Sequence, residues 1–193
     1  MIRTFLFFIL LMFFTSCMEV EHHVYGSKND IKVRIEILAN HSMVQLSNNQ
    51  TGGDVMGDAA DKFRSIGKGI TVKESLREKN GEIYDVVSGA FSVKSKNNQF
   101  SDYTLLFEND QVVIPTPFDN SEWNDENSYL FTDSKYSVFI TKNIFPNVSA
   151  AYTLRPNGKI REVDLKIKGD SYIVEFPLLW WLNGNVIGVA LVK

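Results

Sequence analysis

Cysteine and histidine, which often act as nucleophiles, bases or metal ligands, are rare in this chain. There is a single cysteine, Cys17, and there are three histidines, His22, His23 and His41. One cysteine excludes an intrachain disulfide, and in an exported chain a free thiol is an oxidation hazard unless it has a dedicated role. His22 and His23 are neighbours, so on a β-strand they point to opposite faces and cannot share a metal ion. We therefore expect no metal site, and Cys17 is the residue that needs an explanation.

Motifs of the common enzyme classes are missing from the sequence. It has no Gly-x-Ser-x-Gly motif to place a hydrolase nucleophile, and Gly52-Gly53 does not have the spacing of a phosphate-binding loop. Acidic residues gather in an expected long loop, residues 115–127, but their spacing does not match a calcium loop. We predict that the protein is not an enzyme and has no cofactor; a hydrolase using the carboxylates of this loop is the weaker alternative.

The first sixteen residues have the organisation of an export signal. Arg3 supplies a positive charge, and the run Phe5–Phe14 is entirely apolar. An apolar run of about ten residues is too short to cross a bilayer as a helix, which takes about twenty, but it suits the core of a signal peptide. The small residues Thr15 and Ser16 then precede Cys17. This ending resembles the lipobox of bacterial lipoproteins, although a phenylalanine stands where leucine is usual.

The lipobox resemblance implies that the signal, residues 1–16, is removed and that Cys17 becomes the acylated first residue. A thiol is needed because the diacylglycerol is carried through a thioether. Several acyl chains, such as palmitate, anchor a protein far more firmly than one chain. Met18 stands where an aspartate would signal inner-membrane retention in enterobacteria, so the outer membrane is favoured, on its periplasmic or surface side. An ordinary secretory signal followed by an accidental cysteine is the alternative.

The mature chain has the composition of one globular domain. The sequence is 44% hydrophobic and 22% charged, and no Pro-, Gly- or Ser-rich linker divides residues 17–193. Removal of Arg3 with the signal changes the net charge from −3 to −4. A mildly acidic chain is not expected to bind nucleic acid or to grip anionic headgroups by charge. Membrane attachment would therefore depend on the acyl chains of Cys17.

Hydrophobic periodicity predicts a sheet with one main helix. Apolar and polar residues alternate over 18–25 and 31–37, around a turn at 26–30, which predicts a β-hairpin. Residues 54–68 have a helical pattern instead, with an apolar stripe that includes Phe63. The apolar face of this helix should pack on the sheet.

Further strands are expected along the rest of the chain. They are predicted at residues 70–76, 83–93, 103–107, 112–114, 136–140, 152–154 and 160–167. Asn80-Gly81 should form a tight hairpin turn, and Asn183-Gly184 should join a strand at 176–182 to one at 185–192. A transmembrane segment over 173–192 is the alternative. The predicted fold class is α+β, mostly antiparallel β-sheet with one principal amphipathic helix packed on it, after a cleaved signal helix.

Large apolar side chains concentrate near the C-terminus. Phe176, Leu178, Trp180 and Trp181 lie in one run, where both faces of a strand would be apolar. We predict that these four residues line a site for an apolar ligand or lipid. The alternative is that they close the hydrophobic core.

The order of the predicted elements resembles the LppM-like lipoprotein domain, best known from mycobacteria. The shared features are a lipobox cysteine followed directly by a strand, an apolar-faced helix, the strand start Gly69-Ile70-Thr71-Val72, and a strand, turn and strand over 152–160. The resemblance implies an α+β domain with a hydrophobic cavity that binds lipid or glycolipid at the cell envelope. Members often end in a transmembrane helix, whereas this chain ends in a predicted hairpin.

The sequence therefore predicts a non-catalytic lipoprotein of the bacterial cell envelope, anchored by acyl chains on Cys17. Its expected ligand is a lipid or another apolar molecule. The alternative is a protein-interaction or accessory module of an envelope complex, or a surface antigen.

Overall fold

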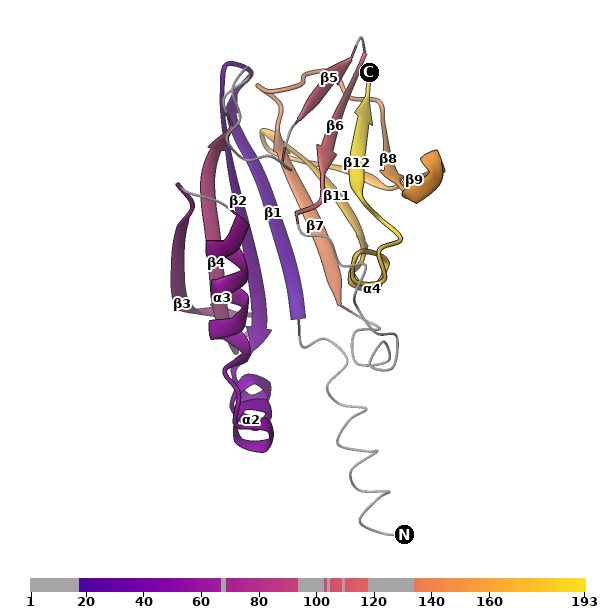
Figure 1. Cartoon of the computed structure of the whole chain (residues 1–193). Helices are drawn as coiled ribbons and strands as arrows, with labels where there is room; N and C mark the ends of the chain where they lie inside the picture. Colours follow the sequence, from indigo (N-terminus) through magenta and orange to yellow (C-terminus); the bar gives the residue numbers. More distant parts are fainter. Residues whose placement is uncertain (1–17, 67–68, 94–102, 104, 109, 118–133) are drawn as a thin grey trace.

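The fold is described from a computed structural model. The described residues are 18–66, 69–93, 103, 105–108, 110–117 and 134–193, so the predictions for the signal segment, for Cys17 and for most of loop 115–127 lie outside them. A seven-stranded sheet and a five-stranded sheet contribute their apolar faces to one main buried cluster (Figure 1). The predicted α+β class with a mostly antiparallel sheet is confirmed.

The predicted N-terminal hairpin forms the middle of the seven-stranded sheet. Strand β1 (Met18–Ser27) pairs antiparallel with β2 (Asp30–Asn40), in a register that places Met18 opposite Ala39. Alternate residues are buried over most of both strands because one face of the hairpin is turned to the core, whereas residues 35–38 of β2 are buried on both faces. We call this the inner face of the sheet and the opposite face, which carries the charged residues, the outer face.

A second predicted hairpin extends the sheet beyond β2. Strands β3 (Thr71–Lys79) and β4 (Glu82–Val93) pair antiparallel, and β4 also pairs with β2. Asn80 and Gly81 have φ values of 55° and 81°. Positive φ at both central residues is what a two-residue turn of type I′ requires, which explains the Asn-Gly pair.

The predicted helix is present and packs on the inner face. Helix α3 (Val55–Ile66) begins after Asp54, whose side chain accepts a hydrogen bond from the backbone of Gly57 at 3.0 Å. Phe63 of the apolar stripe is fully buried. It lies against Gly89 of β4, where an added Cβ would come within 2.5 Å of the Phe63 ring. Gly89 therefore lets the helix approach the strand closely.

A second helix was not predicted. Helix α2 (His41–Thr51) follows β2 directly and starts at Asn40, whose side chain accepts a hydrogen bond from the backbone of Ser42 at 3.1 Å. It ends at Gly52, which has a φ of 68°. The helix has a weak hydrophobic periodicity, with Val44 as its fully inward-facing residue. The prediction relied on an apolar stripe, and a mostly polar helix whose ends are capped by hydrogen bonds does not have one.

The other side of the seven-stranded sheet comes from the second half of the chain. Strand β7 (Lys135–Thr141) pairs parallel with β1 and antiparallel with β11 (Ser171–Pro177), which in turn pairs with β10 (Leu165–Lys168). The strand order is β10-β11-β7-β1-β2-β4-β3. Strand β1 is therefore an interior strand with a partner on each side.

The five-stranded sheet has the order β5-β6-β12-β8-β9. Its strands are β5 (Leu106–Glu108), β6 (Gln111–Pro115), β8 (Ala150–Leu154), β9 (Ile160–Val163) and β12 (Gly188–Val192), and a short 3-10 turn, η2 (Pro156–Gly158), lies between β8 and β9. The predicted single strand over 160–167 is thus wrong, because β9 and β10 belong to different sheets.

The predicted C-terminal hairpin is also wrong. Residues 178–182 form a helical turn, α4 (Leu178–Leu182), and β12 pairs with β6 and β8 instead of with β11. A short run that is apolar on every side suits a buried helix as well as a buried strand, so periodicity does not distinguish them. In the described part of the chain, no helix combines the length and apolarity needed to cross a membrane.

Candidate functional site

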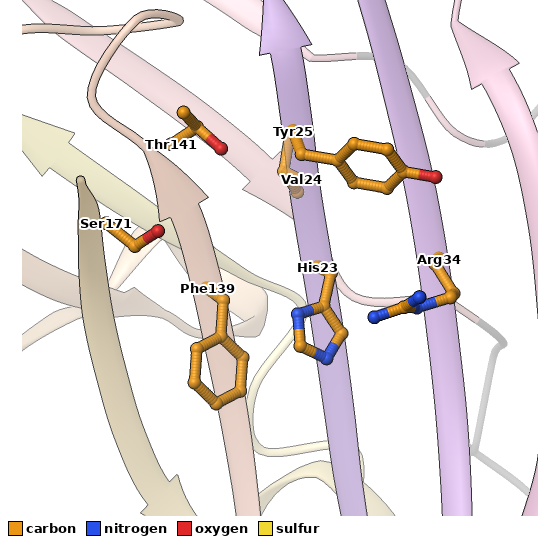
Figure 2. Close-up of a pocket in the computed structure, with 7 residues that line it drawn as sticks. All are labelled: His23, Val24, Tyr25, Arg34, Phe139, Thr141 and Ser171. Carbon is orange, nitrogen blue, oxygen red and sulfur yellow. The ribbon is translucent and has the colours of Figure 1, made fainter. Parts of the chain in front are cut away.

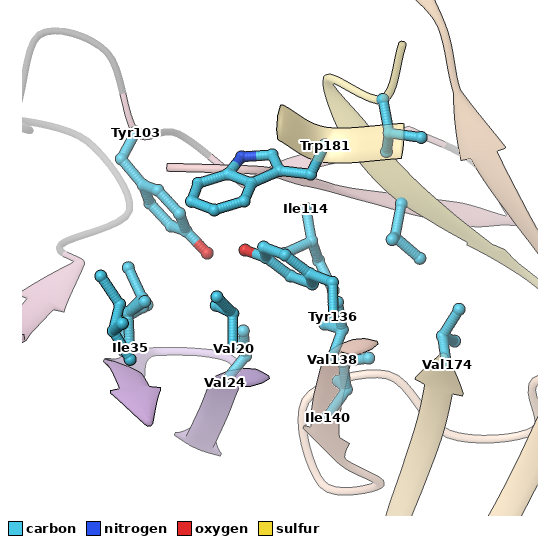
Figure 3. Close-up of a cluster of buried hydrophobic side chains, with 14 of the residues drawn as sticks. Val20, Val24, Ile35, Tyr103, Ile114, Tyr136, Val138, Ile140, Val174 and Trp181 are labelled. Atoms are coloured by element: carbon cyan, nitrogen blue, oxygen red, sulfur yellow. The ribbon is translucent and has the colours of Figure 1, made fainter. Parts of the chain in front are cut away.

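Three of the four predicted ligand-binding residues lie together in the core. Phe176 on β11 and Trp181 on α4 both pack on Tyr136 of β7, with ring centroids 4.9 Å and 5.2 Å from the tyrosine ring. Leu178 is fully buried, and Trp181 donates a hydrogen bond from its indole nitrogen to the backbone oxygen of Pro117 at 3.2 Å. Figure 3 shows Trp181 and Tyr136 among the buried aliphatic side chains of the inner face.

Trp180, the fourth predicted residue, is separated from the other three. It is only partly buried, and the guanidinium groups of Arg161 and Arg155 lie 4.4 Å and 5.6 Å from the centre of its ring. Because neighbouring residues of a short helix point in different directions, Trp181 enters the core while Trp180 packs under these cations. The four residues therefore do not line one common binding site in the structure.

A buried histidine lies beside this aromatic cluster. His22 of β1 has one ring nitrogen 3.1 Å from the hydroxyl of Tyr136 and the other 2.7 Å from the hydroxyl of Tyr103. One nitrogen therefore donates to a hydroxyl oxygen and the other accepts from a hydroxyl, as a neutral imidazole requires. Burial lowers the pKa of His22 to about 3, because a charged ring would lose its hydration. The arrangement keeps a polar group satisfied inside an apolar core.

The outer face of the same strand carries a different histidine environment. The Nε2 atom of His23 lies 3.4 Å from Oε2 of Glu21 and 3.8 Å from Oε2 of Glu36. These residues come together because Glu21 and His23 alternate along β1, and Glu36 faces Glu21 across the β1–β2 pairing. The His23 hydrogen bond is the largest cause that lowers the pKa of Glu21 to about 2, although burial opposes the shift.

Three residues of this cluster are of the types that bind a metal ion. Donor atoms of Glu21, His23 and Glu36 lie within 4.8 Å of one another. However, the guanidinium of Arg77 already contacts both carboxylates, at 3.4 Å from Glu21 Oε2 and 2.9 Å from Glu36 Oε2. These are the two oxygens that face His23. A divalent ion would therefore have to replace the arginine, and the contacts describe an ion-pair network that ties β3 to β1 and β2.

A shallow hollow of about 270 Å³ adjoins this network on the outer face (Figure 2). The ring of Phe139 stacks on that of His23, with centroids 4.5 Å apart and planes within 10°. Polar side chains surround the stacked rings, so the hollow offers a flat aromatic surface beside hydrogen-bonding groups. Its lining residues are His23, Val24, Tyr25, Arg34, Phe139, Thr141 and Ser171.

The sequence prediction missed this outer-face cluster. The sequence shows that Glu21 and His23, two residues apart, share one face of a strand. The position of Glu36 beside them depends on the register of the hairpin, and the contact of Arg77 depends on where β3 lies in the sheet. Phe139 reaches His23 only because β7 pairs with β1. No local pattern indicates a parallel pairing between strands more than a hundred residues apart.

Comparison of this chain with known protein families, with curated proteins and with solved structures found no match.

Proposed function

We propose that this chain is a non-catalytic lipoprotein of the bacterial cell envelope, anchored by acyl chains on Cys17, that binds a partner through the outer face of its seven-stranded sheet. The observation that carries the proposal is the position of β1. This strand begins at Met18, the residue after the proposed lipid attachment, and it has strand partners on both sides.

An interior strand gives the proposed anchor an unusually short connection. Met18 is held opposite Ala39 on β2, and Glu19 opposite Lys135 on β7. Consecutive Cα atoms are about 3.8 Å apart, so the proposed lipid attachment is only one residue away from the paired end of the sheet. A lipoprotein built in this way would hold its domain against the membrane surface, where partners are other envelope molecules.

The outer face supports a surface-binding role better than it supports catalysis. The rings of His23 and Phe139 form a flat surface beside Arg34, whose side chain is 44% exposed, and Tyr25, which is 37% exposed. Such a mixture of aromatic and hydrogen-bonding groups is common in protein interfaces. We therefore favour the interaction-module form of the function.

Binding of a lipid or another apolar ligand is the second candidate. It is favoured by the aromatic cluster of Phe176, Trp181 and Tyr136, which lies between the two sheets. A ligand there would have to displace α4, because Phe176 and Trp181 are 3% and 4% exposed. The hydrogen bonds of α4 to Pro117 and Ser134 oppose such a movement.

Metabolic labelling with palmitate tests the anchor. We expect label on the wild-type protein and none on Cys17→Ala, because no other cysteine can carry the thioether. Absence of label on the wild type would refute the lipoprotein proposal.

Photo-crosslinking in cells tests the binding face. A photoreactive phenylalanine analogue at Tyr25 should give a discrete heavier band, whereas the same analogue at Trp180 should not. A band at Trp180 alone would contradict the outer-face proposal. Lipid found by native mass spectrometry on the purified unacylated domain, and lost in Trp181→Ala, would support the second candidate instead.

A further inference from the structure

We propose that helix α2 lies in the headgroup layer of the membrane that holds the acyl chains of Cys17. The inference rests on the proposed acylation and adds to it the orientation of the domain. It assigns the membrane-contacting surface to one helix that sequence periodicity did not predict.

The position of α2 follows from the register of the first hairpin. Met18 pairs with Ala39, and the next residue of β2, Asn40, caps the start of α2. Cys17 is joined directly to Met18, about 3.8 Å away from Cα to Cα. The lipid attachment and the first turn of α2 therefore belong to the same end of the sheet, and Figure 1 shows α2 projecting beyond that end.

The surface of α2 is suited to a lipid headgroup layer because its residues are mostly neutral, and its one histidine, His41, bonds through Nδ1 to the carboxylate of Asp85 at 2.9 Å. None of its eleven residues is Asp, Glu, Lys or Arg, and its capping residues Asn40 and Gly52 are also uncharged. Leu46 is 38% exposed. The other exposed side chains of the helix are polar and neutral: Ser42, Gln45, Asn49 and Gln50. A helix without Asp, Glu, Lys or Arg and with an exposed leucine enters a polar–apolar boundary at low desolvation cost.

The opposite end of the same hairpin has charged side chains in its turn. The turn between β1 and β2 and the residues beside it expose Lys28, Asp30 and Lys32. This turn lies about 30 Å from Met18, since a strand rises about 3.3 Å per residue. Helix α2 therefore differs from this turn in having no acidic or basic side chain, although the strand ends beside the helix carry charged groups, among them the ion pair of Lys79 with Glu19.

A lipid surface is the occupant that the connectivity favours. Acyl chains must enter the hydrocarbon at Cys17, and each headgroup layer is roughly 5–8 Å deep. A helix that projects from the same end of the sheet lies within reach of that layer, whereas a second protein copy would have to fit between α2 and the bilayer. The absence of a linker between Cys17 and β1 is therefore what selects the membrane.

Site-specific fluorescence on the acylated full-length protein tests the proposal. Acylation consumes the thiol of Cys17, so a cysteine introduced at Leu46 is the single labelling site. Leu46→Cys is labelled with an environment-sensitive dye and reconstituted in phosphatidylethanolamine–phosphatidylglycerol vesicles. The matched control is Asn29→Cys, an exposed residue in the turn between β1 and β2, at the opposite end of the hairpin. Quenching is measured with aqueous iodide and with a lipid that carries a headgroup spin label.

We expect iodide to quench the Leu46 dye at least threefold less than the Asn29 dye, and the spin-labelled lipid to quench the Leu46 dye alone. Equal iodide quenching at both positions in the acylated protein would overturn the inference and leave the proposed function intact. Protection at Leu46 that disappears on tenfold dilution of protein in lipid would also overturn it, because a second copy would then be the cover. An intact mass without acyl chains would refute the proposed function itself.

Discussion

His22 and His23 are adjacent on β1, yet the two faces of the strand place them in opposite electrostatic settings. His22 is fully buried between two tyrosine hydroxyls, and burial lowers its pKa to about 3. His23 lies on the outer face against the carboxylates of Glu21 and Glu36. Around His22 the inner face is apolar and stabilises the fold by packing, whereas around His23 the outer face gathers charges of both signs. Residue type alone therefore says little about what a histidine does here.

The largest expected effect comes from truncating aromatic rings on the two faces. Phe176→Ala on the inner face should lower the free energy of unfolding by about 3–5 kcal/mol, because it leaves a cavity beside Tyr136. Phe139→Ala on the outer face should cost about 1 kcal/mol, since Phe139 is partly exposed and mainly loses its stacking on His23. Urea denaturation of both variants measures the difference, and equal losses would contradict the distinction between the faces.

The second prediction concerns pH. The pKa of His22 in the folded state, about 3, lies below the value of 6.5 that is usual for a solvated histidine. Below pH 6.5 the unfolded chain therefore binds a proton that the folded chain excludes, so stability falls as the pH falls from 6.5 towards 3. By pH 4.5 the loss should be about 3 kcal/mol, two pH units at about 1.4 kcal/mol each.

His22→Gln isolates this contribution. The amide of glutamine can still form hydrogen bonds with both tyrosine hydroxyls, but it does not titrate. Between pH 6.5 and 4.5 the slope of the unfolding free energy against pH should therefore decrease by the amount that corresponds to about one proton. Below pH 4.5 a further loss should remain in both proteins, because the pKa of Glu21 is lowered from 4.5 to about 2 and its protonation opposes folding in that window. An unchanged slope above pH 4.5 would show that His22 is not the group responsible.

The smallest expected effect belongs to the ion pairs of the outer face. Glu36 is 6% exposed at its side chain and Arg77 is 36% exposed, so water partly screens their contact. A double-mutant cycle with Glu36→Gln and Arg77→Gln should give a coupling energy of about 1 kcal/mol that weakens with added salt. A coupling energy near zero would mean that the network does not hold β3 across the sheet.

Sequence patterns predicted the local elements and failed at their assembly. Both early hairpins and helix α3 follow from alternation, an Asn-Gly turn and an apolar stripe, all of which are local properties. Helix α2 was missed because its sequence is polar on most sides and is held by its caps. The C-terminal hairpin was mispredicted because the run 178–182 is apolar on every side, so its period carries no information.

The candidate site was predicted less well than the fold. The apolar residues at 176–181 were identified as a possible site. In the structure, Trp181 packs in the core, whereas Trp180 stacks against the guanidinium group of Arg161. The outer-face network was not identified, because it needs the register of β1 with β2 and the approach of Arg77 from β3. Such contacts arise from pairing and curvature of the sheet, which a linear pattern does not contain.

The sequence by itself determined which face of each early strand is buried and where its turns and main helix lie, because alternation, capping and turn preferences act over a few residues. It also supplied the proposal of an acylated Cys17. Only the tertiary structure decided that β1 is an interior strand and that β7 runs parallel beside it. It also decided that His22 is buried, whereas His23 contacts two carboxylates. These depend on contacts between distant segments, whose free energy is realised only when the whole core forms.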